Sequence, residues 1–294
     1  MDWKTLLATT RLSDKDSNHR NEFDDDYKRI VTSPAFRRLQ DKTQVFPLER
    51  LDFIHTRLTH SLEVAMIART LVSEIVRLLQ QDSLTETDSS KQEMINHQSD
   101  IARIVECASL LHDIGNPPYG HFGEDIIRQW FKKNLPQILA EHSDVAEEFL
   151  ASPYVHDFYH FEGNAQSLRI ISKLHDFKGN FDGLDLTPAT INTILKYTRA
   201  SNQPKTEKIT SKKVGFFRAE EDIFRQITAI TGTGENRHPL TFILEAADDI
   251  AYLIADMEDA IGKGVLRFAV VKEYLHTVLK EDKTSPHSKK VVKY

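Results

Sequence analysis

Histidine, acidic residues and glycine are concentrated in one short segment, HDIGNPPYGHFGE, at residues 112–124. Two histidines, one aspartate, one glutamate and three glycines within thirteen positions are hard to explain by packing alone. His121 and Glu124 are three residues apart at the start of the next expected helix, so the carboxylate can orient the imidazole as a general acid or base. The alternative is that Glu124 is only a first-turn acid favoured by the helix dipole. The pattern favours a catalytic histidine–glutamate pair.

A second set of residues has the types and positions of metal ligands. These residues are His60 and, about fifty positions later, the neighbouring pair His112 and Asp113. Each histidine lies on or beside the apolar stripe of an expected helix, so both imidazoles should point inward. Neutral imidazole and carboxylate together suit a divalent cation. For each histidine taken singly, the alternative is a core side chain satisfied by a backbone carbonyl. Taken together, the three residues predict a metal site.

The segment EAADDIAYLIADMEDA, residues 245–260, carries acids on an otherwise apolar helix. Asp248, Tyr252 and Asp256 are four residues apart in turn and share one face. Acids on so apolar a face need a partner: a metal for one of them, and a substrate hydroxyl or a base for another. Asp249 is rotated by about 100° and is expected in solvent or behind the ligands. The alternative is a charged face exposed to water.

Arg57 precedes His60 by three residues on the same helical face. A guanidinium one turn from a metal site can bind a phosphate oxygen, which suggests a phosphorylated substrate. The sequence contains no phosphate-binding P-loop, no GxGxxG motif and no nucleophile elbow, so it offers no support for P-loop or covalent chemistry.

The elements that must position these residues are predicted to be helices, and the fold class is all-α. No convincing run of alternating β-branched residues is present. We expect one domain over residues 1–294, polar loops near 80–100 and 200–213, and a frayed segment at 281–294. Helices are predicted at residues 58–79, 101–113, 123–133, 163–174, 187–197, 219–230 and 240–261.

Composition narrows the class of protein. A chain of 294 residues with 40 % hydrophobic content can build a substantial core, and no apolar run is long enough to cross a bilayer. The N-terminus lacks the pattern of a secretory signal, and the single Cys107 cannot form an internal disulfide, so a cytoplasmic protein is expected. The net charge of −6 gives no support to single-stranded nucleic acid as a partner, although it does not exclude a local basic patch.

Six blocks of this sequence resemble the deoxynucleoside triphosphate triphosphohydrolases of the HD-domain type, commonly called dGTPases. They occur in the same order, and they are long enough that chance agreement is improbable. The blocks are FDDDYKRIVTSPAFRRLQDKTQVFPLE (23–49), HTRLTHSLEVAMIAR (55–69), LLHDIGNPPYGHFGE (110–124), FEGNAQSLRII (161–171), KKVGFFRAEEDIF (212–224) and EAADDIAYLIADMEDAI (245–261).

The resemblance implies a helical bundle of the HD type and a role for each matching residue. A divalent ion, Mg²⁺ or Mn²⁺, would be bound by four residues, and the reaction would need a catalytic pair and a substrate-binding set. The implied ligands are His60, His112, Asp113 and Asp248; the catalytic pair is His121 and Glu124; the substrate-binding residues are Gln44, Arg57, Asn116, Tyr252 and Asp256. Tyr252 would exclude the ribose 2′-hydroxyl, and Asp256 would accept the deoxyribose 3′-hydroxyl.

The implied reaction is hydrolysis of a deoxynucleoside triphosphate to the deoxynucleoside and inorganic triphosphate. Homo-oligomers and nucleotide effectors are further expectations from the resemblance. Two departures stand out: family members usually extend beyond this C-terminus, so part of the family fold is expected to be absent, and Thr198 replaces a proline typical of the family. The alternatives are another HD-type nucleotidase or phosphodiesterase, or a nucleotide-binding regulatory protein without turnover.

Overall fold

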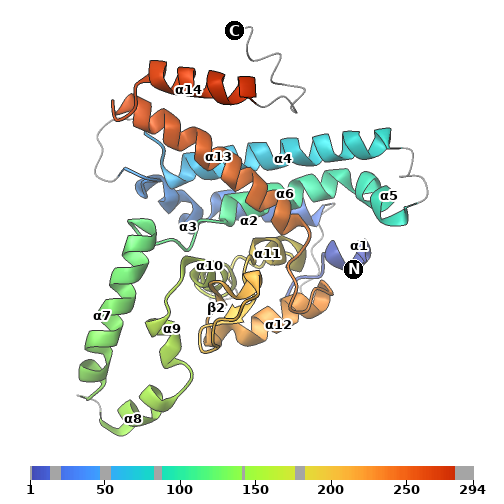
Figure 1. Ribbon diagram of the computed structural model, residues 1–294. Coiled ribbons are helices and arrows are strands. Elements are labelled where there is room, and N and C mark those ends of the chain that lie inside the picture. The colour runs from blue at the N-terminus through green and yellow to red at the C-terminus, as the bar shows by residue number, and fades with distance from the viewer. Residues whose placement is uncertain are drawn as a thin grey trace.

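The computed structural model describes residues 2–13, 21–46, 54–82, 88–140, 143–175 and 183–281, and it confirms an all-α fold (Figure 1). Two long helices, α4 and α13, carry five of the eleven predicted site residues, and α7 carries two more. The elements are α1 Trp3–Leu6, α2 Glu22–Thr32, α3 Pro34–Arg37, η1 Arg38–Asp41, α4 Arg57–Gln81, α5 Ser89–Asn96, α6 Gln98–Leu111, α7 Gly120–Ala140, α8 Ser143–Ala151, α9 Val155–Tyr159, α10 Gly163–Ser172, α11 Pro188–Ile194, β1 Arg199–Ala200, η3 Ile209–Ser211, β2 Val214–Phe216, η4 Arg218–Glu220, α12 Glu221–Ile230, α13 Leu240–Gly262 and α14 Phe268–Glu281.

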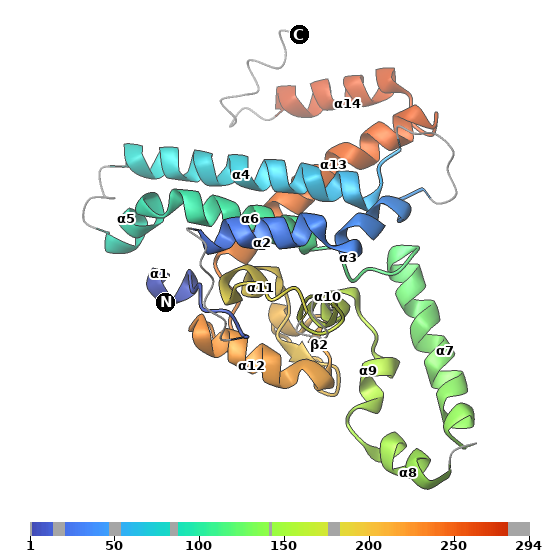
Figure 2. The same ribbon diagram turned by 180° about the vertical axis from the view of Figure 1, so that it is seen from behind.

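The core lies where α4, α6 and α13 pack together, with α2 and α11 against α6. Both views of the ribbon show α4 and α6 running side by side (Figures 1 and 2). Their contact is lined by fully buried small and branched residues such as Val64, Ala68, Ile104 and Ala108. Small side chains let the helices approach closely, so groups at the same level on α4, α6 and α13 are brought together.

Local sequence explains where the helices of the site begin. At the start of α4, Thr56 caps the Thr59 amide, and the Thr59 hydroxyl accepts from the Thr56 amide. This reciprocal cap places Arg57 in the first turn and His60 on the inner face one turn later. The α6 helix ends at Leu111, and four turn residues, 112–115, lead toward α7.

Two loop predictions were wrong in part. Residues 80–100 contain the end of α4, all of α5 and the start of α6, while 83–87 lie outside the described residues. The α5 helix buries none of its residues, so it has no apolar periodicity to reveal it; its cap is Asp88, which accepts from the Ser90 and Lys91 amides. Residues 200–213 include one end of a short parallel pairing between β1 and β2.

The helix predictions otherwise differ from the structure mainly at their ends. The α7 helix continues to Ala140 through Pro136, and α11 ends at Ile194, three residues before the predicted end. The sequence did not predict the helices α1, α2, α3, α5, α8, α9 and α14. The frayed segment predicted at 281–294 lies outside the described residues beyond Glu281. Among the described residues, no helix is both long and apolar enough to cross a membrane.

Buried polar contacts attach the N-terminal segment to the bundle. The His238 ring donates from Nε2 to the Leu6 carbonyl at 3.0 Å, and its Nδ1 accepts from the Leu240 amide at 3.2 Å. One ring nitrogen is therefore a donor and the other an acceptor, which requires the neutral imidazole. Burial lowers the pKa of His238 to about 4, against a smaller opposing effect of the Leu6 bond.

Candidate active site

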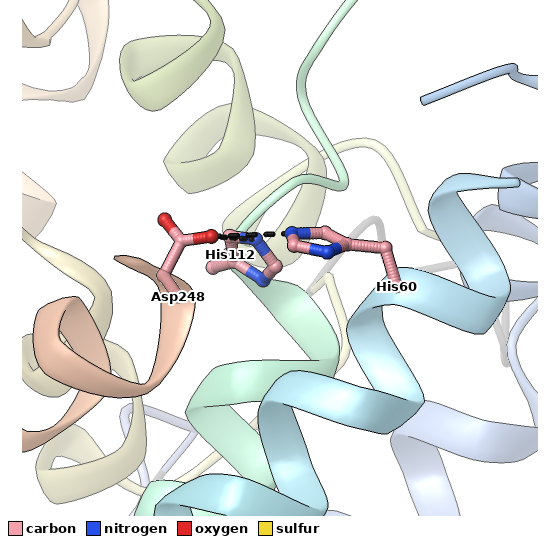
Figure 3. Close-up of side chains that lie close together, drawn as sticks. All are labelled: His60, His112 and Asp248. Carbon is pink, nitrogen blue, oxygen red and sulfur yellow. Dashed lines mark hydrogen bonds and ion pairs between the residues drawn. The ribbon is translucent and has the colours of Figure 1, made fainter. Parts of the chain in front are cut away.

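Three side chains from three helical segments converge in the core of the bundle (Figure 3). His60 comes from α4, His112 from the C-terminal cap of α6, and Asp248 from α13. The His60 Nε2 atom lies 3.1 Å from Asp248 Oδ1, and the His112 Nε2 atom lies 3.5 Å from the same oxygen. One ligand atom from each of the three residues lies within 4.8 Å of the other two.

This donor set has the composition of a divalent metal site. The His112 Nδ1–H donates to the Ser109 carbonyl at 2.7 Å, so in the neutral ring Nε2 presents its lone pair toward Asp248. His60 and His112 are nearly inaccessible to solvent, and Asp248 is partly exposed. A bound ion would thus be held by two buried imidazoles and one carboxylate while keeping open positions for other ligands.

The local charge also favours a cation. Burial opposes ionisation of Asp248, but His112, His60 and Lys196 outweigh burial and lower the pKa of this carboxyl. Burial likewise lowers the pKa of His112, but Asp113 and Asp248 raise it, and the net shift is upward. Carboxylates therefore outweigh burial in the electrostatics around the His112 imidazole, as a cation site requires.

Asp113, the fourth predicted ligand, lies beside this group rather than within it. Its Oδ1 atom is 3.6 Å from His112 Nε2 and accepts from the Asn116 side-chain amide at 2.6 Å. Its Oδ2 atom is 2.5 Å from the Arg57 Nη1 atom. Burial raises the pKa of Asp113, but His112 and Arg57 outweigh burial and lower it. The predicted ligand role of Asp113 stays a prediction.

The predicted catalytic pair is in contact at the start of α7. His121 Nδ1 lies 2.8 Å from Glu124 Oε2, and Glu124 Oε1 accepts from the Gly163 amide at 2.8 Å. Glu124 is only 2 % exposed, whereas the His121 side chain is 73 % exposed. The buried carboxylate therefore fixes Nδ1 as the donor and leaves Nε2 free of it, with Lys213 Nζ 3.2 Å away.

Close backbone packing holds this pair in place. A Cβ atom added to Gly163 would lie 2.1 Å from Asn116 Oδ1 and 2.9 Å from Glu124 Oε1. A Cβ atom added to Gly115 would lie 2.2 Å from the Gly163 carbonyl oxygen. At Gly115 the obstacle is backbone, so only glycine fits there, whereas a side chain at Gly163 would displace Asn116 and Glu124. The two glycines let α10 approach the 112–120 turn closely enough for its first amide to bind Glu124.

Gln44 and Arg57 lie on paired backbone segments. The Gln44 amide donates to the His55 carbonyl at 3.1 Å, the Arg57 amide donates to the Lys42 carbonyl at 2.8 Å, and Thr43 and Thr56 form an antiparallel bridge. This pairing brings the Gln44 side chain to the same cavity as Arg57.

Tyr252 and Asp256 follow Asp248 at successive turns of α13 and are in contact with each other. The hydrogen bond and charge of Asp256 raise the pKa of the Tyr252 hydroxyl. One carboxylate oxygen of Asp256, Oδ1, is buried and has no hydrogen-bond partner within the described part of the chain. The same is true of Gln44 Oε1. Two buried acceptors are thus available to a bound molecule with hydroxyl or amine donors.

One cavity of about 630 Å³ joins most of these residues. Its volume suits a small-molecule substrate. Eight of the eleven predicted site residues line it, and Glu124, His112 and Asp256 lie behind lining residues that they contact. The eight are Gln44, Arg57, His60, Asp113, Asn116, His121, Asp248 and Tyr252.

Two lysines in the site were not anticipated from the sequence. Lys196 Nζ lies 3.0 Å from Asp248 Oδ2, and Lys213 Nζ lies 3.2 Å from His121 Nε2. Lys213 belongs to the KKVGFF block, which could have directed attention to it. Lys196 follows the end of α11 in an irregular segment, where no periodic pattern indicates which way a side chain points.

Comparison with known proteins gives the family. The HD domain family matches residues 57–253, a range that contains the three clustered residues and the histidine–glutamate pair. The chain belongs to the HD-domain family. The match runs from α4 through most of α13, and these elements bring His60, His112 and Asp248 together in the structure.

Relatives in this family are similar over nearly all of the chain. A deoxyguanosinetriphosphate triphosphohydrolase-like protein of Listeria monocytogenes is 45 % identical over 97 % of this chain and 61 % of its own length. One of Pseudomonas aeruginosa is 39 % identical over 96 % of this chain and 62 % of its own. The deoxyguanosinetriphosphate triphosphohydrolase of Yersinia enterocolitica is 39 % identical over 95 % and 58 %. The HD-domain chain thus spans about three fifths of these relatives.

Proposed function

We propose that this HD-domain chain carries the active site of a metal-dependent hydrolase that converts a deoxynucleoside triphosphate to the deoxynucleoside and inorganic triphosphate. The main support is that the His60–His112–Asp248 cluster and His121 line or adjoin the same 630 Å³ cavity. Arg57 lines this cavity as well, so a cation site, a proton-transfer group and a phosphate-binding guanidinium all face one volume. The printed names of the relatives support the same substrate class.

In the proposed site, a divalent ion is held by His60, His112 and Asp248, with Asp113 as the fourth ligand. Such an ion polarises a phosphoryl oxygen and lowers the pKa of water when it is bound. Imidazole and carboxylate ligands are compatible with Mg²⁺, Mn²⁺ and other divalent ions.

The chain's own residues orient the phosphate and move the proton. Arg57, which lines the cavity, binds an α-phosphate oxygen, and Asn116 lines the same cavity. His121 transfers a proton at Nε2, because Glu124 engages Nδ1. That proton comes from the attacking water or goes to the departing 5′-oxygen.

The sugar is proposed to bind between Gln44 and α13. The buried, unpartnered Gln44 Oε1 and Asp256 Oδ1 atoms are acceptors suited to hydroxyl groups, and Asp256 is assigned to the 3′-hydroxyl. Tyr252, packed against Asp256, is proposed to occupy the space that a ribose 2′-hydroxyl would need.

The bond that breaks provides the decisive test. Hydrolysis in oxygen-18 water should place the label in inorganic triphosphate and leave the deoxynucleoside unlabelled. Pyrophosphate and a deoxynucleoside monophosphate as products would overturn the assignment of the broken bond, which is the one between the α-phosphorus and the 5′-oxygen.

The alternative is another HD-type phosphohydrolase, or a nucleotide-binding protein that does not turn over. A panel of deoxynucleoside triphosphates, ribonucleotides, monophosphates and cyclic nucleotides, with chromatography of the products, separates the enzymatic options. Nucleotide binding by a wild-type chain that releases no product in this panel would favour the regulatory alternative.

A further inference from the structure

A further histidine, His55, lies between the two sides of the proposed sugar pocket. Its carbonyl accepts the Gln44 amide, and it precedes Arg57 by two residues. Any displacement of His55 would therefore move the backbone that carries both proposed substrate contacts.

Asp259 fixes His55 to the opposite side of the pocket. The His55 Nδ1 atom lies 2.7 Å from Asp259 Oδ1, and the His55 amide donates to both carboxylate oxygens at 3.4 and 3.3 Å. Asp259 is only 1 % exposed and lies on α13, three residues after Asp256. One aspartate thus binds the ring and the backbone of His55 to the helix of Tyr252 and Asp256.

The other ring nitrogen of His55 also faces carboxylates. Nε2 lies 3.0 Å from Glu63 Oε1 on α4 and 4.0 Å from Glu258 Oε2 on α13. Carboxylates only accept, so the imidazole must carry a proton on both nitrogens to bond Asp259 and Glu63 together. Burial lowers the pKa of His55, but the bonds and charges of Asp259 and Glu63 outweigh burial and raise it.

We propose that His55 is a positioning residue that, clasped by Asp259 and Glu63, holds Gln44 and Arg57 in register with Tyr252 and Asp256 and so sets substrate affinity. The inference rests on the proposed function, because the substrate contacts are those assigned there. His55 touches no reacting atom in this scheme; it acts through the two residues whose backbone it holds.

The contacts of His55 with Asp259 and Glu63 depend on pH, because they need the protonated ring. Because the pKa of His55 is raised above its ordinary value of 6.5, the doubly bonded form is fully present below that value and is lost as pH rises through the raised pKa. The bond to Glu63 is then lost first, since Asp259 is the buried partner. Substrate affinity should therefore weaken toward alkaline pH while the chemical step is unchanged.

The test compares His55→Gln with His55→Arg. Glutamine can donate to only one of the two carboxylates, so KM should rise about tenfold with kcat within about twofold. Arginine keeps a permanent charge and can donate to both, so it should restore KM and abolish the alkaline rise in KM. His97→Gln changes a partly exposed histidine beside Asp100; it is the matched control and should leave both parameters unchanged.

Two further measurements keep failure of the clasp apart from failure of the proposed function. Hydrogen exchange should show faster exchange of the Gln44 and Arg57 amides in His55→Gln, whatever the substrate is. Binding of a deoxyguanosine triphosphate analogue in which carbon replaces the 5′-oxygen, so that the proposed reaction cannot cleave it, tests the pocket of the wild type by itself. No binding by the wild type would overturn the proposed function; equal binding and equal exchange in wild type and His55→Gln would overturn the clasp.

Discussion

Arg57 and Asp113 form an ion pair in which Nη1 and Oδ2 are 2.5 Å apart. The two oxygens of Asp113 are therefore divided: one faces the guanidinium, and the other lies 3.6 Å from the His112 Nε2 atom. If Asp113 is a ligand, Arg57 orients it, in the way that outer groups usually orient metal-binding side chains. The phosphate-binding and cation-binding functions of the site are then mechanically linked.

This division predicts graded losses of metal affinity. Asp113→Asn removes a charged ligand and should weaken Mn²⁺ binding as much as His60→Ala does, whereas Arg57→Gln removes only its orientation and should weaken binding by about 10- to 100-fold. Titration of the apo-protein with Mn²⁺ measures all three. Wild-type affinity in Asp113→Asn together with lost affinity in His60→Ala would contradict a ligand role for Asp113.

Neighbouring aspartates on α13 allow a matched comparison. Asp248 is in the cluster, whereas Asp249 is exposed at the cavity wall. Asp248→Asn should abolish detectable Mn²⁺ binding, and Asp249→Asn should change affinity by no more than about threefold, as expected for a screened surface charge. Equal losses in the two variants would indicate that overall negative charge, rather than ligation, attracts the ion.

The His121–Glu124 pair predicts a loss in kcat with little change in affinity. His121→Ala should lower kcat by about 10²- to 10⁴-fold, the usual contribution of a general acid or base. Glu124→Gln should lower kcat less, because the imidazole remains but is held less firmly. Steady-state kinetics with a saturating metal concentration measures both, and unchanged turnover in His121→Ala would show that another group moves the proton.

Gly163 predicts that one methyl group disrupts the catalytic pair. In Gly163→Ala the new Cβ would lie 2.1 Å from Asn116 Oδ1 and 2.9 Å from Glu124 Oε1, so Glu124 must move away from His121. We expect a fall in kcat similar to that of Glu124→Gln and a loss of about 1–3 kcal/mol in the free energy of unfolding.

Gly234→Ala is the control for backbone strain. Gly234 has a φ of +57° and open space around it, so alanine there should cost about 1 kcal/mol without changing kcat. A normal kcat in Gly163→Ala would mean that α10 does not position Glu124.

The buried His238 predicts acid sensitivity of the fold. Its pKa is about 4 in the folded chain and 6.5 ordinarily, so the unfolded state binds the proton more tightly. Stability is therefore fully present above pH 6.5 and falls as pH drops toward 4, by about 3 kcal/mol at most from this group. Urea unfolding between pH 4 and 8 measures this. The free energy of unfolding should fall less steeply toward pH 4 in His238→Gln than in the wild type, and an identical fall would assign the acid sensitivity to other groups.

The sequence predicted which of the candidate residues lie near one another better than it predicted the backbone around them. Helical periodicity separated Asp248 from Asp249, because a repeat of four along an apolar face is read directly from the chain. It could not place Lys196, which lies in the irregular segment after α11 and reaches Asp248 only through tertiary packing. Nor could it indicate that Gly163 is required, because the steric conflict is with Asn116 and Glu124 on another segment.

Short polar elements were missed for a related reason. The α5 helix has no fully buried residue, and only Met94 and Ile95 pack partly against the core, so its apolar pattern is weak. The Asp88 cap and a hydrogen bond from Trp3 to Ser90 also hold it. The parallel pairing of β1 with β2 joins only two or three residues on each side. Segments of two or three residues are too short to show the alternation of apolar and polar residues by which strands are predicted.

The three clustered side chains come from segments that are far apart in the chain; His60 and Asp248 are separated by 188 positions. A ligand that binds His60, His112 and Asp248 together therefore acts as a crosslink, closing long loops that remain open in the unfolded chain. The bundle has no disulfide to do this, since its single cysteine is Cys107. A chelator should thus lower the Tm of the metal-loaded protein as well as stop turnover, which makes cohesion of the bundle and its chemistry depend on the same three residues.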